Sequence, residues 1–372
     1  MSDPASVNGP TIRMRDAGYY SAHTTGAKLV IDAVAGLVLE ALGSMDLHAG
    51  DGPFAIADFG AADGGTSIDL HRAAITWLRA RMPDRPITLT YTDLPHNDFS
   101  TLFRLVHGLL PGRAGPSLHD MQGLFTFASG ASFYRQIFPD ASLRFGFSAT
   151  AMHWLSALPA MIADHVHAVG ATGAEREAFR RRAMMDWETI LLLRARELAP
   201  GGRLVLANFC EDEAGHYLGY TGGRSMHEEF SRHWCALRVA GAIGEEECRR
   251  ATFPQYYKTI AEFRTPFDDP SSPVRQAGLT LRQCHSAVTP CPYAARFRQD
   301  GDPVAFARSY VPTLRSWSES MFMAALDPAR PLPERQDIID RFYDAYEADV
   351  AAAPEGHAMD YVHCFMAIAK DG

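Results

Sequence analysis

The sequence lacks the features of a membrane-spanning or secreted protein. It contains no run of about 18 apolar residues. Its first ten residues, MSDPASVNGP, have neither the basic start nor the apolar core of a signal peptide. The six cysteines show no CxxC spacing, which argues against a disulfide framework or a zinc site. We therefore expect a cytoplasmic protein that has no metal site and does not enter a membrane.

The sequence also has fewer positively charged than negatively charged residues. The chain has 35 Lys and Arg residues against 44 Asp and Glu residues, a net charge of −9 at pH 7. The absence of a basic stripe argues against partners such as nucleic acid or an anionic membrane surface. At 372 residues, of which 47% are hydrophobic, the chain can bury a large core as one or two domains. Small-molecule chemistry is the class of function that these observations leave.

A glycine-rich turn between an apolar run and a helical stretch is the most informative feature that the chain does have. Residues 53–59 are strand-like, Gly60, Gly64 and Gly65 follow, and residues 66–81 have helical periodicity. Glycine lets the backbone adopt positive φ and lets a ligand approach the main chain without meeting a Cβ atom. The pattern predicts a strand, a tight turn and a helix that together hold a ligand.

Acidic residues flank this turn and end the next apolar run. Asp58 and Asp63 lie on either side of Gly60, and the β-rich run 87–93 ends in Asp93. A carboxylate at the end of such a strand can accept hydrogen bonds from both hydroxyls of a ribose. Two carboxylates beside the turn would repel a pyrophosphate but suit a cationic ligand. The pattern indicates a site for S-adenosylmethionine (SAM), which carries a sulfonium and an ammonium group.

Two other interpretations start from the same strand, turn and helix. An NAD-dependent oxidoreductase would need G-x-G-x-x-G and an acid about 20 residues further on. Here the spacing is Gly60-x-x-x-Gly64-Gly65, and Asp93 follows well beyond that distance. A glycine turn that binds nothing is the second alternative, and the residues of the turn alone leave it open.

Strands and helices are expected to alternate, which predicts a doubly wound, Rossmann-like α/β fold. We expect residues 1–25 to form a lid segment and residues 26–210 to form the cofactor-binding α/β domain, completed by residues 270–300 and 356–372. Residues 211–269 and 301–355 are expected to form a helical cap over the acceptor pocket. The further expected elements are helices at 26–42 and 186–198 and strands at 143–148, 201–208, 280–288 and 359–370.

Five motifs in order resemble the SABATH family of carboxyl methyltransferases, named after salicylic acid, benzoic acid and theobromine. They are Asp58-Phe59-Gly60 with its small-residue turn, the stretch from Thr92 to Phe103, Gly130-Ala131-Ser132-Phe133-Tyr134, His153-Trp154-Leu155-Ser156, and Phe253-Pro254-Gln255-Tyr256. The resemblance implies a class I methyltransferase sheet with a helical cap, SAM as cofactor and a homodimer. It also implies methylation of a carboxylate or, in one branch of the family, of a purine nitrogen.

The resemblance implies positions for the cofactor. Asp58 would lie near its methionine end and Asp93 at the ribose, with Leu94 against the adenine. Ser132 and Phe133 would line the adenine side. The remaining residues that we expect at the cofactor are Gly60, Asp63, Ser148, and Tyr20, whose ring face can stabilise a sulfonium.

The same resemblance implies positions for the acceptor. Tyr20 resembles the family's N-terminal aromatic residue. Trp154 resembles the indole whose N–H meets the acceptor carboxylate, and His153 is its neighbour; we assign these two as the catalytic residues. Four more residues fall, by counting from nearby motifs, at positions that shape the pocket in relatives, namely Met226, His227, Tyr256 and Leu314.

One departure from the family pattern concerns the acceptor carboxylate. Relatives carry a glutamine shortly after the N-terminal tyrosine, and the aligned residue here is Ala27. Burying a carboxylate with too few donors costs several kcal/mol. Another group must therefore replace the glutamine, or the acceptor is not a simple carboxylate. The candidates are His23, Thr25, Lys28 and Trp154.

The expected reaction is an in-line methyl transfer that forms the ester of a small, aromatic or otherwise apolar carboxylic acid. A carboxylate is ionised at neutral pH and needs no general base. The alternative is N- or phenol O-methylation of a small heteroaromatic compound, for which His153 or His227 would be the base. A protein that binds the cofactor without catalysis is a further alternative, because Ala27 removes an acceptor contact.

Overall fold

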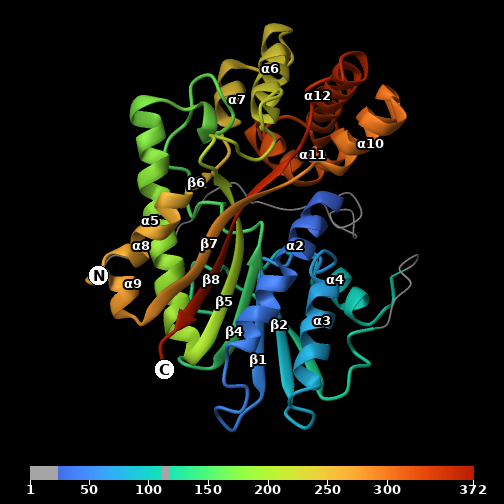
Figure 1. Ribbon diagram of the computed structural model, residues 1–372. Helices are drawn as coiled ribbons and strands as arrows, with labels where there is room; N and C mark the ends of the chain where they lie inside the picture. Colours follow the sequence, from blue (N-terminus) through green and yellow to red (C-terminus); the bar gives the residue numbers. More distant parts are fainter. Residues whose placement is uncertain (1–23, 111–116) are drawn as a thin grey trace.

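A largely parallel β-sheet forms the lower half of the molecule in Figure 1, which shows a computed structural model. The structure describes residues 24–110 and 117–372. The strand order is β3-β2-β1-β4-β5-β8-β7, and β6 pairs with β5 outside this path. β8 runs antiparallel to β5 and β7, and the other neighbouring strands of this path are parallel to each other. The strands are β1 Phe54–Phe59, β2 Ile87–Asp93, β3 Leu124–Gly130, β4 Leu143–Ala149, β5 Leu198–Glu211, β6 Lys258–Thr259, β7 Leu279–Thr289 and β8 Tyr361–Lys370.

The strand order confirms the predicted doubly wound α/β fold. The chain moves outward from β1 to β3 and then returns to the other side of β1 with β4. Ligands of open α/β sheets bind outside the carboxyl ends of the strands at such a reversal. The sequence analysis predicted no strand at β3. This strand lies at the edge of the sheet, and its Phe125 and Phe127 side chains are exposed.

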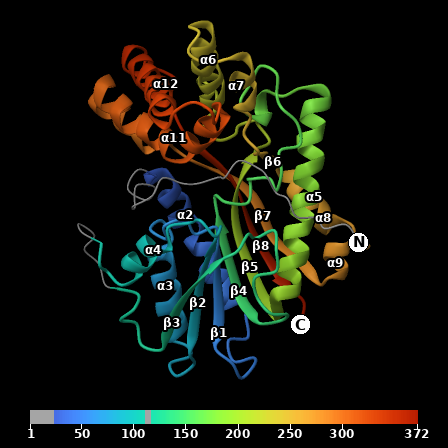
Figure 2. The same cartoon turned by 180° about the vertical axis from the view of Figure 1, so that it is seen from behind.

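Helices cover both faces of this sheet (Figures 1 and 2). Successive residues of a strand point to opposite faces, and β5 follows this rule. Its Val205 and Ala207 join the core beneath one set of helices, and its Leu204 and Leu206 join the core beneath the other. The first set is α2 Thr25–Gly43, α3 Ile68–Arg79 and α4 Phe99–Val106, and the second is α5 Gly173–Glu197, α8 Ile260–Asp268 and α9 Pro273–Gln276.

A helical layer sits above the carboxyl ends of the parallel strands, as expected for the cap (Figure 1). Aromatic side chains fill its interior: the ring centroid of Phe322 lies 4.4 Å from that of Phe342 and 4.9 Å from that of Trp234. The helices of this layer are α6 Met226–Val239, α7 Glu245–Arg250, α10 Pro292–Asp300, α11 Pro303–Ala325 and α12 Leu332–Ala352. The short 3₁₀ helix η1 Ala168–Gly170 precedes α5 in the chain and contacts α5 and α6.

Two helices lie on the other side of the expected domain boundaries. Helix α8, expected in the cap, packs with Phe263 and Phe267 into the core shared by α5 and the sheet. Helix α10, expected with the sheet, stacks Phe297 on Phe306 of α11 at 5.2 Å. We propose to divide the chain accordingly, with α8 in the sheet domain and α10 in the cap.

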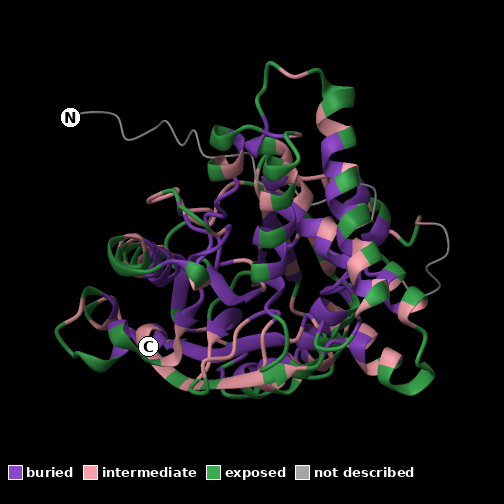
Figure 3. Cartoon of the chain, turned by 90° about the horizontal axis from the view of Figure 1, so that it is seen from above, coloured by how far each residue is buried: buried purple, intermediate pink, exposed green. Residues whose placement is uncertain are grey.

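Burial follows this layered plan. Figure 3 shows buried residues along the strands, enclosed by helices whose outer turns are exposed. Among the described helices, none combines the length and apolarity needed to cross a bilayer. The expected lid segment lies largely outside the described residues, and so do Tyr20 and His23, to which the sequence analysis gave roles in binding.

Candidate functional site

The turn after β1 takes the conformation that its glycine predicts. Gly60 has φ of +79°, and a Cβ atom on it would lie 2.4 Å from the Cβ of Ala151. The N–H groups of Gly60 and Ala61 donate to the carbonyl of Thr92 at 2.8 and 3.1 Å. The carboxyl ends of β1 and β2 are therefore tied together at this turn, where Gly60 and Ala62 are half-buried.

Asp93 holds this turn by its side chain. Its Oδ2 accepts a hydrogen bond from the N–H of Ala62 at 2.7 Å, and its Oδ1 accepts one from the N–H of Leu94 at 2.7 Å. Burial raises the pKa of Asp93, and the two N–H donors oppose that rise. Each carboxylate oxygen retains a lone pair after these bonds, so the group can still accept from ribose hydroxyls.

Asp58 is committed to helix α3. Its Oδ2 accepts the hydroxyl of Ser67 at 2.6 Å and lies 2.8 Å from Nε2 of His71, and the residue is only 2% exposed. These contacts fix the start of α3 against the end of β1. Asp58 therefore holds the first turn of α3, and its expected place near the methionine end of the cofactor stays a prediction.

The other residues expected at the cofactor surround the same edge of the sheet. Asp63 Oδ1 accepts from the N–H of Gly65 at 3.0 Å within the turn. Ser148 is fully buried, and its hydroxyl donates to the carbonyl of Phe59 at 2.6 Å. Ser148 therefore joins β4 to β1 and uses its hydroxyl on the backbone. The sequence analysis missed Asn97, whose amide donates to the carbonyl of Ala62 at 2.8 Å.

Ser132 and Phe133 follow the end of β3, beside the segment that follows β2. A Cβ atom on Gly130 would lie 3.2 Å from Cα of Pro95, so the two segments are in contact. The carbonyl of Phe133 accepts from Nη1 of the buried Arg194 at 3.1 Å. This arrangement leaves Leu94, Ser132 and Phe133 at one side of the Asp93 turn. The glycine cradle and the Asp93 carboxylate fit an adenosine-bearing cofactor.

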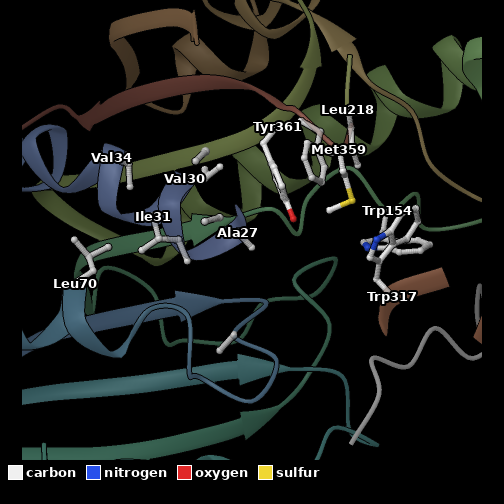
Figure 4. Close-up of a cluster of buried hydrophobic side chains, with 14 of the residues drawn as sticks. Ala27, Val30, Ile31, Val34, Leu70, Trp154, Leu218, Trp317, Met359 and Tyr361 are labelled. Atoms are coloured by element: carbon white, nitrogen blue, oxygen red, sulfur yellow. The ribbon is translucent and has the colours of Figure 1, made fainter. Parts of the chain in front are cut away.

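A narrow cavity of about 30 Å³ opens between this edge of the sheet and the cap. Five of its lining residues, Ala27, Tyr361, Met359, Trp154 and Trp317, are labelled in the close-up of Figure 4. This volume holds about one water molecule, so an acceptor can enter only if the surrounding side chains move apart. Its lining residues are Thr24, Ala27, Thr150, His153, Trp154, Phe209, Leu218, Gln255, Trp317, Met359 and Tyr361.

The segment that carries His153 and Trp154 is fixed by backbone contacts. Trp154 forms an isolated antiparallel bridge with Gln255. The N–H of Leu155 donates to the carbonyl of Pro254 at 2.7 Å, and the hydroxyl of Tyr134 donates to the carbonyl of Trp154 at 2.7 Å. Two of the motifs found in the sequence are therefore paired with each other at the cavity.

His153 lies among aromatic rings. Its ring centroid is 4.8 Å from that of Phe209 and 5.4 Å from that of Trp154. Burial, together with nearby His363, Lys258 and His227, holds the pKa of His153 well below its usual value. The imidazole is therefore neutral at physiological pH and a weak base.

Six of the described residues expected at the acceptor are absent from the lining of this cavity, and one of them, Thr25, is exposed. The ammonium of Lys28 is paired with Asp32 at 2.9 Å and with Asp69 at 3.2 Å on the surface of α2. The ring of His227 stacks on that of His167 at 4.1 Å, away from the lining. The other three are buried in cores, namely Met226, Tyr256 and Leu314.

The cap also brings together three potential metal ligands that the sequence analysis did not connect. Side-chain atoms of Glu229, His233 and Asp349 lie within 4.8 Å of one another. The guanidinium group of Arg232 contacts the carboxylates of Glu229 and Asp349, so their negative charges are already paired with a positively charged side chain. This arrangement is that of an ion-pair network between α6 and α12.

Comparison with known proteins decides the family. The sequence profile of the family described as SAM dependent carboxyl methyltransferase matches residues 15–371. The chain belongs to this family. The match confirms the resemblance to the SABATH enzymes and establishes the chain as a SAM-dependent carboxyl methyltransferase.

Relatives and a solved structure agree with this assignment. Methyltransferase FUS9 of Gibberella fujikuroi is 28% identical over 277 residues, covering 72% of this chain and 70% of that protein. Indole-3-acetate O-methyltransferase 1 of Arabidopsis thaliana is 26% identical over 233 residues, covering 58% and 60%. The structure titled "Loganic acid methyltransferase with SAH" aligns over 97% of this chain and 99% of that chain, with a TM-score of 0.71 and 20% identity. Its fold is the fold of this methyltransferase.

Proposed function

We propose that this methyltransferase forms the methyl ester of a small aromatic carboxylic acid that binds in the cavity beside Trp154. The observation that carries the proposal is the character of the walls. Trp154, Trp317, Phe209 and Tyr361 supply aromatic surface, and none of the described lining residues is Asp, Glu, Lys or Arg. An apolar pocket with a few neutral donors suits a flat acid whose single charge needs hydrogen bonds.

The properties of His153 favour a carboxylate over a phenol. A phenol with a pKa near 10 must lose a proton to react, and its base should have a pKa near the working pH. The pKa of His153 lies well below its ordinary value, so the imidazole is a poor base. A carboxylate arrives ionised and requires only orientation. His227, the other expected base, stacks on His167 outside the cavity lining.

The roles of the side chains follow from this chemistry. When bound, SAM supplies an activated methyl group to the acceptor oxygen. Asp93 would hold the ribose, and Asp58 would keep the turn in place through Ser67 and His71. Trp154 would donate its indole N–H to the carboxylate while the aromatic walls exclude water. Alignment of the reacting atoms is the main contribution required of the protein.

Names of relatives support an acid as acceptor. One relative is called an indole-3-acetate O-methyltransferase, and the similar solved structure a loganic acid methyltransferase. Indole-3-acetate is aromatic and loganic acid is not. Because the cavity has an aromatic lining, we propose an aromatic acid as the acceptor. We expect the side chains of Met359, which is flexible, and Leu218, which is apolar, to move when the aromatic ring of the acid enters the cavity.

The first test is single-turnover methyl transfer from labelled SAM to a panel of aryl and indolyl acids with matched phenols and amines. We expect base-labile label on the acids alone. Trp154→Phe removes one N–H donor and should raise the KM for the acid about tenfold or more. Trp77→Phe, on the outer side of α3, is the matched control and should leave KM unchanged. Label on phenols or amines alone would contradict the proposal.

Oligomeric state and location complete the proposal. The resemblance to the SABATH enzymes and the prevalence of two-fold dimers favour a homodimer. The composition favours the cytoplasm and a small molecule as the partner, with neither nucleic acid nor membrane. Light scattering after size-exclusion chromatography distinguishes a dimer from a 40.9 kDa monomer.

A further inference from the structure

We infer that Gln255 supplies the amide that binds the acceptor carboxylate, in place of the glutamine that relatives carry at the position of Ala27. The inference rests on the proposed function, because it names the group that holds the acid. Ala27 and Gln255 come from distant parts of the chain, yet both line the cavity beside Trp154. A side chain from the opposite wall can therefore replace the missing amide.

The side chain of Gln255 has an unused donor. The residue is 1% exposed, and its Nε2 has no hydrogen-bond partner among the described residues. Its Oε1 lies 3.4 Å from the hydroxyl of Tyr257, and its amide group also interacts with His167, but neither contact gives Nε2 an acceptor at hydrogen-bond distance. A buried donor without a partner is costly, and native proteins rarely keep one unless a ligand or water completes it.

The backbone places this donor next to the indole of Trp154. Gln255 and Trp154 are partners in an isolated antiparallel bridge, and paired residues have Cα atoms about 4.5–5.5 Å apart. The N–H of Gln255 donates to the carbonyl of Phe253 at 2.8 Å, which fixes the backbone on the other side. Both residues line the cavity, so their two donors can reach one carboxylate from neighbouring backbone positions.

The facing wall carries a matching feature. Nε1 of Trp317, on α11 of the cap, is also buried without a partner in the described part of the chain, and Trp317 lines the same cavity. Indole Nε1 and amide Nε2 are donors only, whereas a carboxylate only accepts. A carboxylate has two oxygen atoms that only accept, so it can satisfy both donors at once.

The start of α2 shows why the amide comes from elsewhere. A Cβ atom on Gly26 would lie 2.1 Å from the ring of Tyr361, so this ring rests against the first turn of the helix. Ala27 is the next residue and is 2% exposed. Ala27 lines the cavity with a methyl group alone, so this position offers the acid no amide donor.

The test compares Gln255→Leu with the wild type on the best acid of the panel. We expect the KM for the acid to rise about ten- to a hundredfold, because a charge-assisted hydrogen bond is lost. The Kd for S-adenosylhomocysteine, measured by calorimetry, should stay within about twofold. Gln283→Leu, which removes a glutamine that binds Glu40 far from the cavity, is the matched control. An unchanged KM in Gln255→Leu would overturn the inference.

Two further variants separate binding of the acid from a structural role. Gln255→Glu keeps the size of the side chain and its acceptor for Tyr257, but it repels the acid, so its KM should rise even if Gln255→Leu does not fold. An unchanged KM in Gln255→Glu would also overturn the inference. Adding Ala27→Gln to Gln255→Leu should recover much of the lost affinity, which a packing defect would not allow. Failure of the wild type to esterify any acid would instead remove the proposed function.

Discussion

Two aspartates at the ends of neighbouring strands show how one residue type acquires two roles. Asp93 uses both oxygens on backbone N–H groups and keeps lone pairs for a ligand. Asp58 uses one oxygen on Ser67 and His71 and is sealed beneath the turn. Both end apolar runs in the sequence, and the sequence analysis placed both at the cofactor, Asp58 near its methionine end and Asp93 at the ribose. The difference arises from which side chains α3 brings to each carboxylate.

Asp93→Asn tests the role of the open carboxylate. An asparagine presents an NH₂ group to one of the two backbone N–H donors and loses the charge that strengthens the hydrogen bonds to a ribose. We expect the Kd for S-adenosylhomocysteine, measured by calorimetry, to rise about tenfold or more. Asp140→Asn, which changes an exposed aspartate paired with Arg196, is the control and should leave the Kd unchanged. Equal Kd values for both variants would contradict the assignment.

The residues at the cavity were partly predictable from the sequence. His153 and Trp154 line it and were found because they form a local motif. Trp317 and Tyr361 line it as well and were missed, because they come from α11 and β8. Counting from motifs cannot give the distance between the cap and the sheet. Leu314 was therefore chosen on the same helix as Trp317, although Leu314 is fully buried and absent from the cavity lining.

At the scale of elements, periodicity predicted most of the sheet. The strands expected at 280–288 and 359–370 correspond to β7 and β8 within two residues at either end. Strand β3 was not predicted because it lies at the edge of the sheet. Phe125 and Phe127 are exposed there, so the strand has no continuous run of buried residues. The boundary between sheet and cap was less predictable, because α8 and α10 are short helices whose partners are set by tertiary packing.

Helix α2 offers a matched pair of glycines. A Cβ atom on Gly36 would meet no other segment of the described chain within 4 Å, whereas one on Gly26 would meet the Tyr361 ring. We expect Gly36→Ala to raise the free energy of unfolding by about 0.5–1 kcal/mol through helix propensity. Gly26→Ala should lower it by about 1–3 kcal/mol, because the methyl group overpacks the contact. Urea unfolding measures both, and equal effects would show that the ring does not rest on the helix.

At the scale of the whole molecule, buried histidines set a limit on acid stability. His153, His167, His227 and His363 are all buried, and burial lowers the pKa of each; that of His363 falls to about 3. Their unfolded-state pKa is about 6.5. Below that value the unfolded chain binds protons that the folded protein excludes, so the free energy of unfolding falls as the pH falls. Protonation of carboxylates whose pKa is lowered in the folded protein also reduces the free energy of unfolding, but only in more acid solution.

The size of this effect is measurable. Each such histidine should cost about 1 kcal/mol at pH 5.5 relative to pH 7.5, and the four together amount to a large part of the stability of a typical protein. His363→Phe keeps a ring between Tyr361 and Phe365 but cannot be protonated. We expect it to flatten the loss of stability between pH 6.5 and 5 in urea unfolding. His48→Gln, on the surface, is the control, and equal slopes would contradict the assignment.

The position of β8 has a consequence for how the protein is made. This strand follows every other strand in the sequence, yet it lies between β5 and β7 in the sheet. During synthesis, β7 leaves the ribosome before its partner in the sheet exists, and β5 presents an open edge beside α2. Such an edge invites association with other nascent chains. Tyr361 and Met359 reach the cavity at the same late step, so the acceptor pocket is complete only when β8 has joined the sheet. A chaperone that covers the edges of β5 and β7 until then would protect the unfinished sheet and the unfinished pocket from aggregation.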